Sequence, residues 1–291
     1  MTIDHSQLPQ SLSEVIEASQ TSMVRIKLDN ASDALSLTDS KIGGLGYLPE
    51  DKAYPYTDAG NPLSLLIQIN FEQLADNIDV GQLAHPLPTS GILQIYIDAT
   101  DDVYGADYDN PTPSDAYQVR FWKDISAPVN TQALREAKLA IQGYISDDEY
   151  YPPFDVHQEI ALKFVPQTQS CSPSCIDFSY YLKTIDDSAQ ETEFFDYLES
   201  LGIEDIDDIH DVYNEIANAQ GHQLLGYPYF TQTDPRTFDD AIQQHILLLQ
   251  IDTDDDFNIS WGDCGVAHFF ITPKALANED FSGLIYHWDC Y

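Results

Sequence analysis

A chain of 291 residues with 43% hydrophobic and 12% aromatic side chains can bury a large core, which excludes intrinsic disorder as its main state. Lys and Arg number 12 against 49 Asp and Glu, so the net charge is −37. With so few cations and no basic stripe, binding to a nucleic-acid backbone or an anionic membrane surface is not expected. The acidity has two interpretations: a solvated surface adapted to its environment, or a surface that attracts a basic partner.

The beginning of the chain, residues 1–6, has neither the basic segment nor the apolar segment of a secretory signal, and no apolar run is long enough to span a bilayer. A cytoplasmic location is therefore expected. Cys171 and Cys175 form a C-x3-C pair, and Cys264 and Cys290 complete the set of four cysteines. This spacing matches no standard zinc finger, so free, partly buried thiols are expected in a reducing compartment.

The first third of the chain predicts a short helix followed by strands. Three glycines and a proline in residues 43–49 indicate a tight, unusual backbone turn. The apolar runs that follow are typical of buried strands, and a later alternating run is typical of a third strand. The predicted elements are a helix at 7–20 and strands at 25–28, 65–69, 91–97 and 117–122.

The middle, roughly residues 131–220, is predicted to be helical, with candidate helices at 133–141, 192–198 and 203–217. The last has the clearest helical spacing of apolar residues. Its opposite face carries a run of charge that we interpret as a solvated face. The acidic residues of that face are Asp207, Asp208, Asp211 and Glu215.

The end of the chain repeats the pattern of its beginning. Residues 226–230, 247–252 and 265–271 resemble 44–48, 65–70 and 91–97, in the same order. Each glycine-led strand is expected to pair with the preceding strand as an antiparallel hairpin. We infer an internal duplication and an α+β fold in a single domain over residues 1–291. Its parts are a β-rich half at about 24–125, the helical middle, and a β-rich half at about 221–291.

The same segments resemble the YwqG-like family. Lys41-Ile-Gly-Gly, Leu65-Leu-Ile-Gln-Ile-Asn-Phe and Asp101-Asp-Val-Tyr-Gly are similar to the first half of its pattern. Leu225-Gly-Tyr-Pro-Tyr-Phe-Thr-Gln, Trp261-Gly-Asp-Cys-Gly and Tyr286-His-Trp-Asp-Cys are similar to the second. The resemblance covers about residues 40–290.

The resemblance implies a bacterial protein of unknown function with a duplicated sheet. Some members of the family are encoded near toxin and immunity genes, which implies a protective, partner-binding role. No catalytic residues are agreed for the family, so none can be transferred to this chain. The W-G-D-x-G motif of the family does not require Cys at position 264, which weakens a nucleophilic role for Cys264.

One candidate site is an acidic segment near the end of the chain. Asp252, Asp254, Asp256 and Asp263 fall at positions one, three, five and twelve of a calcium-loop spacing. Phe257 stands where that loop needs glycine, and the flanks predict strands where the loop needs helices. The segment therefore predicts either a divalent-cation site or an acidic hairpin turn, since Asp favours turns.

Two further candidates use cysteine, histidine and aromatic residues. Cys264 with His268, His287 and Asp289 could form a nucleophilic site, but on one strand Cys264 and His268 would lie roughly 13 Å apart, too far for a hydrogen bond. Aromatic residues near the two glycine turns could line a ligand cleft between the halves. They are Tyr47, Tyr227, Tyr229, Trp261 and Trp288.

Neither G-x-S-x-G nor H-E-x-x-H occurs in the chain. We therefore favour a non-enzymatic protein-binding module with an acidic surface, of the immunity or antitoxin type, without a required cofactor. The alternative is a small-ligand- or cation-binding protein, or an enzyme, with its site between the halves.

Overall fold

The structure is a computed structural model that describes residues 8–30, 34–144, 152–189 and 194–291. These residues form an α+β fold with one ten-stranded sheet. The strands are β1 (Thr21–Asp29), β2 (Lys41–Ile42), β3 (Ser64–Asn70), β4 (Ile92–Ile97), β5 (Tyr117–Trp122), β6 (Ile160–Gln169), β7 (Gln223–Leu224), β8 (Ile246–Asp252), β9 (Val266–Ile271) and β10 (Ile285–Asp289). The α-helices are α1 (Gln10–Ala18), α2 (Phe71–Ala75), α3 (Thr131–Tyr144), α4 (Ile176–Ile185), α5 (Phe194–Ser200), α6 (Ile206–Ile216) and α7 (Pro273–Ala277).

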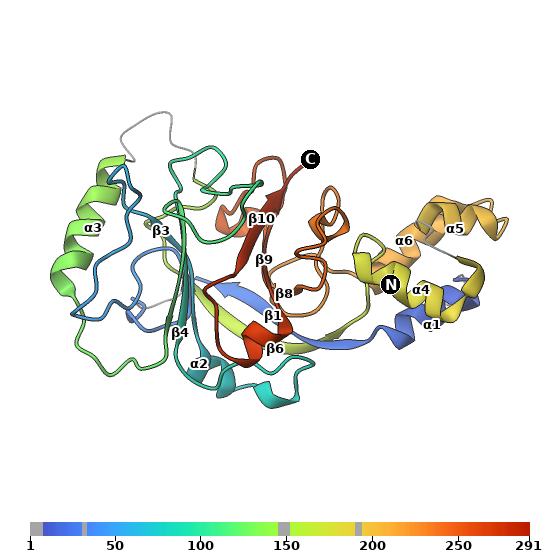
Figure 1. Cartoon of the computed structure of the whole chain (residues 1–291), viewed down its shortest axis with the longest axis horizontal. Helices are drawn as coiled ribbons and strands as arrows, with labels where there is room; N and C mark the ends of the chain where they lie inside the picture. Colours follow the sequence, from blue (N-terminus) through green and yellow to red (C-terminus); the bar gives the residue numbers. More distant parts are fainter. Residues whose placement is uncertain (1–7, 31–33, 145–151, 190–193) are drawn as a thin grey trace.

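The sheet curls so that its two ends approach each other (Figure 1). Its order is β10-β9-β8-β7-β1-β6-β2-β3-β4-β5, with antiparallel pairing throughout. The Tyr117 ring of the edge strand β5 lies 5.0 Å from the Tyr286 ring of the other edge strand, β10. The backbone N–H of Tyr286 donates to the carbonyl of Pro111 at 2.9 Å. The main core therefore fills the inside of the curl, with residues from both ends of the chain.

Strands β3, β4 and β9 are buried along their whole length. A strand buried on both faces needs apolar residues at consecutive positions. This is why these segments are continuous apolar runs in the sequence and do not alternate between apolar and polar residues. The predicted hairpins are confirmed, because β3 pairs with β4 and β8 pairs with β9 in antiparallel register.

The two hairpins share local features. Each has a register shift in its first strand, between Leu65 and Ile67 in one and between Leu247 and Leu249 in the other. In the first hairpin, the Gln68 Oε1 atom accepts a hydrogen bond from the backbone N–H of Tyr47 at 2.9 Å.

The second hairpin repeats this contact, because Gln250 Oε1 accepts from the backbone N–H of Tyr229 at the same distance. Both glutamines also donate from Nε2 to two backbone carbonyls. A buried glutamine thus supplies hydrogen-bond partners for the irregular backbone segment that precedes each hairpin.

The glycine turn predicted near residue 43 is present. Gly43 has φ of 75°, and a Cβ placed there would lie 2.2 Å from the carbonyl oxygen of Gln158. Gly226, after β7, has a similar φ of 76°. Only glycine fits a site that combines positive φ with so close an approach of another backbone.

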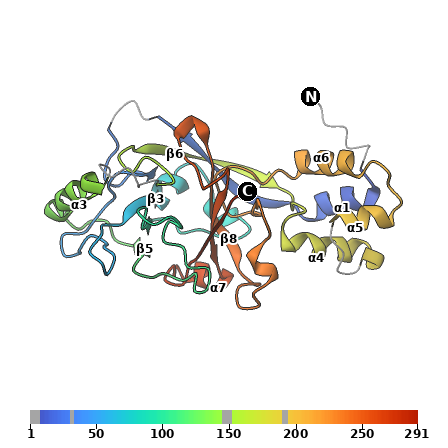
Figure 2. The ribbon, with the colours of Figure 1, turned by 90° about the horizontal axis from the view of Figure 1, so that it is seen from above.

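Helices α1, α4, α5 and α6 form a layer of their own beyond the ends of β1 and β6 (Figures 1 and 2). We call these helices the helical arm, and the sheet with α2, α3 and α7 the sheet body. The arm has a second hydrophobic core that is separate from the core of the sheet body. Leu12 of α1, Phe178 of α4 and Tyr213 of α6 meet there with almost no exposed surface.

The helical middle predicted for residues 131–220 is wrong over residues 160–169, which form the long strand β6. Most of its residues are half-exposed or exposed and Pro166 interrupts the run, so no clear strand periodicity is visible in the sequence. Strand β6 is stabilised instead by pairing with β1 along its whole length, from Thr21 opposite Gln169 to Asp29 opposite Ala161. Helix α4 lies within the predicted helical middle but was not among its candidate helices, and strand β10 was not predicted.

Candidate binding surface

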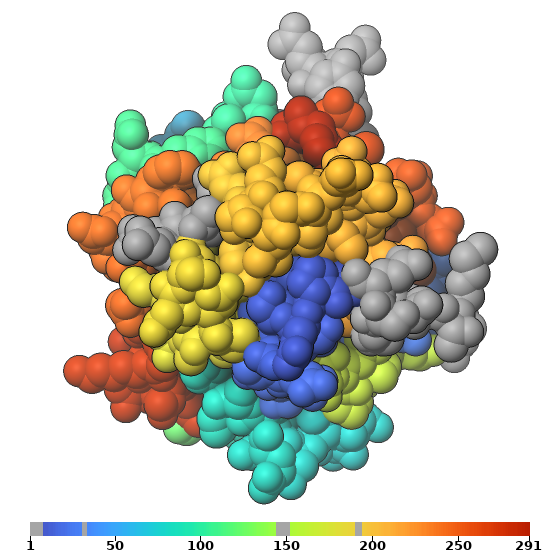
Figure 3. Space-filling model, turned by 90° about the vertical axis from the view of Figure 1, so that its right-hand side faces the viewer, coloured from blue at the N-terminus to red at the C-terminus, as the bar shows by residue number. Residues whose placement is uncertain are grey.

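Figure 3 shows the outer side of the helical arm facing the viewer. Most of the acidic residues in the described part of the arm are exposed. Between residues 170 and 220, Lys183 is the one Lys or Arg in the sequence. The solvated acidic face predicted for α6 is confirmed, because its four acidic residues are exposed. The exposed carboxylates of α5, α6 and their neighbouring loops are Asp187, Asp196, Glu199, Glu204, Asp205, Asp207, Asp208, Asp211 and Glu215.

Large apolar side chains lie among these charges. Tyr180 is 70% exposed, Phe195 is 45% exposed and Leu201 is 43% exposed. The Phe195 ring packs 4.9 Å from the His210 ring of α6. Exposed aromatic residues surrounded by polar groups are typical of protein-interaction surfaces.

Three cavities open on the arm, and each is lined in part by α6. A cavity of about 530 Å³ lies between Leu8 and Ile209, and another of about 470 Å³ lies between Phe195 and Asp207. The third, of about 560 Å³, lies between α6 and the segment that contains Tyr229. The arm therefore offers concave sites with carboxylates in their walls.

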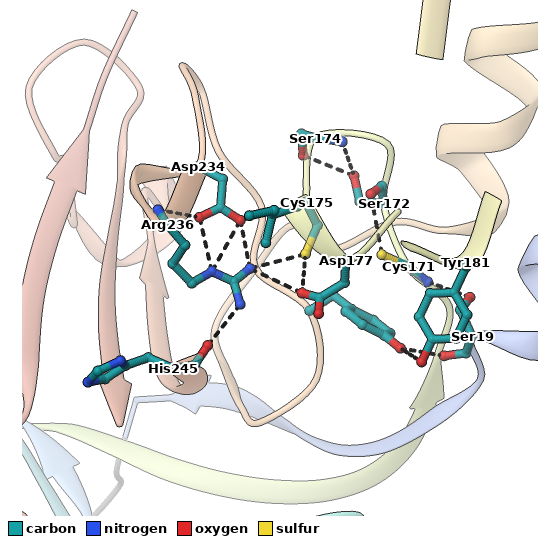
Figure 4. Close-up of polar contacts among 12 residues, drawn as sticks. Ser19, Cys171, Ser172, Ser174, Cys175, Asp177, Tyr181, Asp234, Arg236 and His245 are labelled. Atoms are coloured by element: carbon teal, nitrogen blue, oxygen red, sulfur yellow. Dashed lines mark hydrogen bonds and ion pairs between the residues drawn. The ribbon is translucent and has the colours of Figure 1, made fainter. Parts of the chain in front are cut away.

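A buried polar cluster joins the arm to the sheet body (Figure 4). Arg236 lies in the short 3-10 helix Pro235–Thr237 and is 3% exposed. Its Nη2 atom donates to Asp234 Oδ2 at 2.6 Å and to Cys175 Sγ at 3.2 Å, and it lies 3.3 Å from Asp177 Oδ2. Asp234 Oδ2 also accepts from the backbone N–H of Ile176, in the first turn of α4. The cluster therefore fixes the start of α4 against the second half of the chain.

The charges in this cluster are compensated locally. Burial alone would lower the pKa of the Arg236 guanidinium, but the hydrogen bonds that it donates to Asp234 and the negative charges of Asp234 and Asp177 raise it. Burial raises the pKa of the Cys175 thiol. The thiol therefore stays protonated at neutral pH and donates to Asp177 Oδ2 at 3.0 Å. This position is structural and does not favour a thiolate nucleophile.

The predicted C-x3-C pair consists of free, buried thiols. Cys171 is fully buried, and burial raises its pKa well above the ordinary value. Its backbone N–H donates to Ser19 Oγ, and its carbonyl accepts from the Tyr213 hydroxyl at 3.1 Å. Over the described ranges, no three or more His, Cys, Asp or Glu side chains are grouped so that they could hold a metal ion.

The five aromatic residues predicted to line one cleft lie in different places. Trp261 and Trp288 pack in the main core, with ring centroids 6.2 Å apart. Tyr227 belongs to the arm core, where its hydroxyl donates to the Ser19 carbonyl at 2.8 Å.

The hydroxyl of Tyr47 donates to the Ala127 carbonyl at 3.0 Å, so Tyr47 is held by the sheet body. Among the four cavities described for the chain, Tyr229 is the one member of the predicted set that lines a wall. The structure therefore does not bring the five residues together in one site.

The four predicted cation ligands occupy a turn and its flanks. Asp252 ends β8 and accepts from the backbone N–H of Gly221 at 2.6 Å, and burial raises its pKa. Asp254 caps the backbone N–H of Asp256 and lies 3.3 Å from the ring of His222. Asp256 and Asp263 are exposed. These contacts are those of an acidic turn, the alternative that the sequence left open.

The Cys264 and His268 pair is not positioned for catalysis. Strand β9 begins at Val266, so the expectation that both residues share a strand is wrong. Cys264 lies in the preceding turn with φ of 52° and is exposed, whereas His268 is fully buried. His268 lies opposite His287 in the register of β9 with β10, and its ring Nε2 contacts the Tyr229 carbonyl at 2.6 Å. His268 therefore supports the backbone of residue 229.

Comparison with known proteins identifies the family. A family model described as a domain of unknown function, DUF1963, matches residues 40–290. No curated protein sequence matches the chain. Helix α1 and strand β1 precede the matched residues, although α1 packs in the arm and β1 lies at the centre of the sheet. None of the helices in the described part of the chain has the length and apolarity needed to cross a bilayer.

Proposed function

We propose that this chain, which belongs to the DUF1963 family of domains of unknown function, has a non-enzymatic role. It would bind a basic protein partner through the helical arm. The observation that carries this proposal is the segregation of charge: exposed carboxylates cover the arm, and Lys183 is its one Lys or Arg between residues 170 and 220. Negatively charged carboxylates on a protruding surface attract a positively charged partner over a distance of about one Debye length, roughly 8 Å at physiological salt.

The finer assignments belong to the same proposal. The YwqG-like resemblance and the DUF1963 match cover the same residues, which supports treating them as one family. The shared register shifts and the equivalent contacts of Gln68 and Gln250 support an internal duplication. We infer a cytoplasmic, bacterial protein of the immunity or antitoxin type, in which the acidic arm covers a basic partner.

The proposal is tested by neutralising arm carboxylates outside the third cavity. In the variant Glu199→Gln/Glu204→Gln/Asp208→Asn, affinity for a flexible lysine-rich peptide should fall roughly tenfold, because each exposed ion pair contributes about 0.2 to 1 kcal/mol. The matched control, Glu50→Gln/Asp58→Asn/Asp109→Asn, removes the same charge from exposed sites on the sheet body. Isothermal titration calorimetry at low and high salt measures both.

Two results would contradict the proposal. Equal loss of affinity in the two variants would show that net charge alone attracts the peptide, without a preferred surface. An affinity that does not change between low and high salt would remove the electrostatic basis altogether.

A further inference from the structure

The third cavity of the arm combines carboxylates with aromatic rings. It has a volume of about 560 Å³, and we call it the α6–Tyr229 pocket. One wall is α6, where Asp211 and Glu215 are exposed and lie four residues apart. Residues at this spacing lie on the same face of a helix, so both carboxylates are presented to the same side.

Three aromatic residues also line the pocket. They are Tyr229, Phe230 and Tyr291, and the hydroxyls of the two tyrosines are hydrogen-bonded at 3.0 Å. Burial, followed by the hydrogen bond with Tyr291, raises the pKa of Tyr229 to about 12. Tyr229 is therefore uncharged at neutral pH, and the acidic side chains in the lining of the pocket are Asp211 and Glu215 of α6.

The carboxylates in the pocket have little cationic compensation. No lysine or arginine is found among the described residues that line it. The nearest titratable partner is the His210 ring, whose Nδ1 lies 3.7 Å from Asp211 Oδ1. A cation that entered the pocket would meet both carboxylates and aromatic side chains, which bind cations through ion pairs and cation–π contacts.

We propose that the α6–Tyr229 pocket binds an arginine side chain of the basic partner. A guanidinium is planar, so it stacks on an aromatic ring while its N–H groups donate to a carboxylate at the side. A lysine ammonium is a more strongly hydrated point charge and uses the aromatic rings less well. This assignment rests on the proposed function, because it names the chemical group that the acidic arm recognises.

The test compares three peptides, each an acetylated and amidated tripeptide with glycine on both sides of the central residue. The central residue is arginine, lysine or citrulline, and citrulline keeps the shape of arginine without its charge. Titrations followed by NMR of the full chain should show the arginine peptide binding at least threefold more tightly than the lysine peptide. The citrulline peptide should not saturate at the same concentrations.

Two pocket variants should weaken arginine binding selectively. Glu215→Gln removes one carboxylate, and Tyr291→Ala removes a ring that is 72% exposed, so neither change disturbs a core. Each should lower affinity for the arginine peptide roughly fivefold. The control Glu199→Gln makes the same charge change outside the pocket and should lower the affinities for arginine and lysine equally, by less than twofold.

The outcomes separate the two proposals. If the arginine and lysine peptides bind equally, and Glu215→Gln has no more effect than Glu199→Gln, the pocket is not an arginine site, although the acidic arm still binds cations. If neither basic peptide binds and the lysine-rich peptide also fails to bind, both the pocket and the proposed function are rejected. Strong binding of citrulline would show that charge is not what the pocket recognises.

Discussion

The sheet body and the helical arm are stabilised in different ways. The body buries whole strands on both faces, and its irregular turns are held by buried glutamines such as Gln68 and Gln250. The arm packs a smaller core and has a densely acidic exterior. The body therefore provides a rigid scaffold, and the arm provides the charged surface. The buried Arg236 cluster joins the two, so it is where their difference can be tested.

The largest expected effect comes from separating the two regions at their junction. In Arg236→Ala, Asp234 would remain buried at 1% exposure without its cation, which typically costs about 3 to 5 kcal/mol. The loss should appear in urea unfolding and as faster proteolysis within the arm than within the body.

A surface ion pair serves as the control for the junction. Lys163 lies 2.6 Å from Asp29, and both side chains are largely exposed. The change Lys163→Ala should therefore cost about 1 kcal/mol or less. A similarly small loss in Arg236→Ala would mean that apolar packing alone holds the arm.

Acid should weaken the body through His287, a half-buried histidine of the edge strand β10. Burial lowers the pKa of His287 from 6.5 to about 4, so the unfolded chain takes up a proton before the native chain does. The free energy of unfolding should therefore fall as the pH drops from about 6.5 to 4, by roughly 2 to 3 kcal/mol for this residue. Denaturation of the wild type and of His287→Gln at several pH values measures the difference.

Other groups also titrate near the range from pH 4 to 6.5. The difference between the wild type and His287→Gln is therefore more informative than the pH dependence of either protein alone. Burial raises the pKa of Asp252 and Asp289, which makes the native state bind protons more readily and opposes the effect of the histidine. The difference between the wild type and His287→Gln cancels these contributions. The same slope in both proteins would contradict a His287 that is neutral in the native state.

The smallest expected effect comes from making the same Tyr→Phe change in each of the two cores. The hydroxyl of Tyr213 in the arm donates to the Cys171 carbonyl at 3.1 Å, and the hydroxyl of Tyr117 in the body donates to the Leu284 carbonyl at 3.2 Å. Both rings are buried, so Tyr213→Phe and Tyr117→Phe should each cost about 1 kcal/mol. A loss confined to Tyr117→Phe would show that the arm core accommodates an unpaired carbonyl, for example by admitting water.

Local patterns were sufficient to predict much of the sheet body. The buried runs at β3, β4 and β9 and the glycine turn at Gly43 could be recognised because burial on both faces and positive φ restrict which residues are possible. The strand β6 could not be recognised, because its stability depends on pairing with β1, far away in the sequence. Secondary structure that depends on distant partners has no strong local pattern.

The candidate site was predicted less well than the fold. The acidic face of α6 was visible from helical spacing, because charges that recur with that period lie on one side. Arg236 and its contact with Cys175 were missed, since they join residues far apart in the chain. The one available indication was the rarity of cations: an arginine two residues after an aspartate, in a chain with only 12 Lys and Arg, was a candidate for a buried pair.

The central place of β1 has a consequence for synthesis on the ribosome. Both strands that pair with it, β6 and β7, come much later in the chain. Helices α4 and α6, which share the arm core with α1, also come later. While the polypeptide is emerging, β1 therefore has unpaired backbone on both sides, although β3, β4 and β5 can already form a meander. Closing contacts of such high sequence separation is slow, and unpaired strands invite aggregation. Strand β1 thus stays open to aggregation until β6 and β7 have been synthesised.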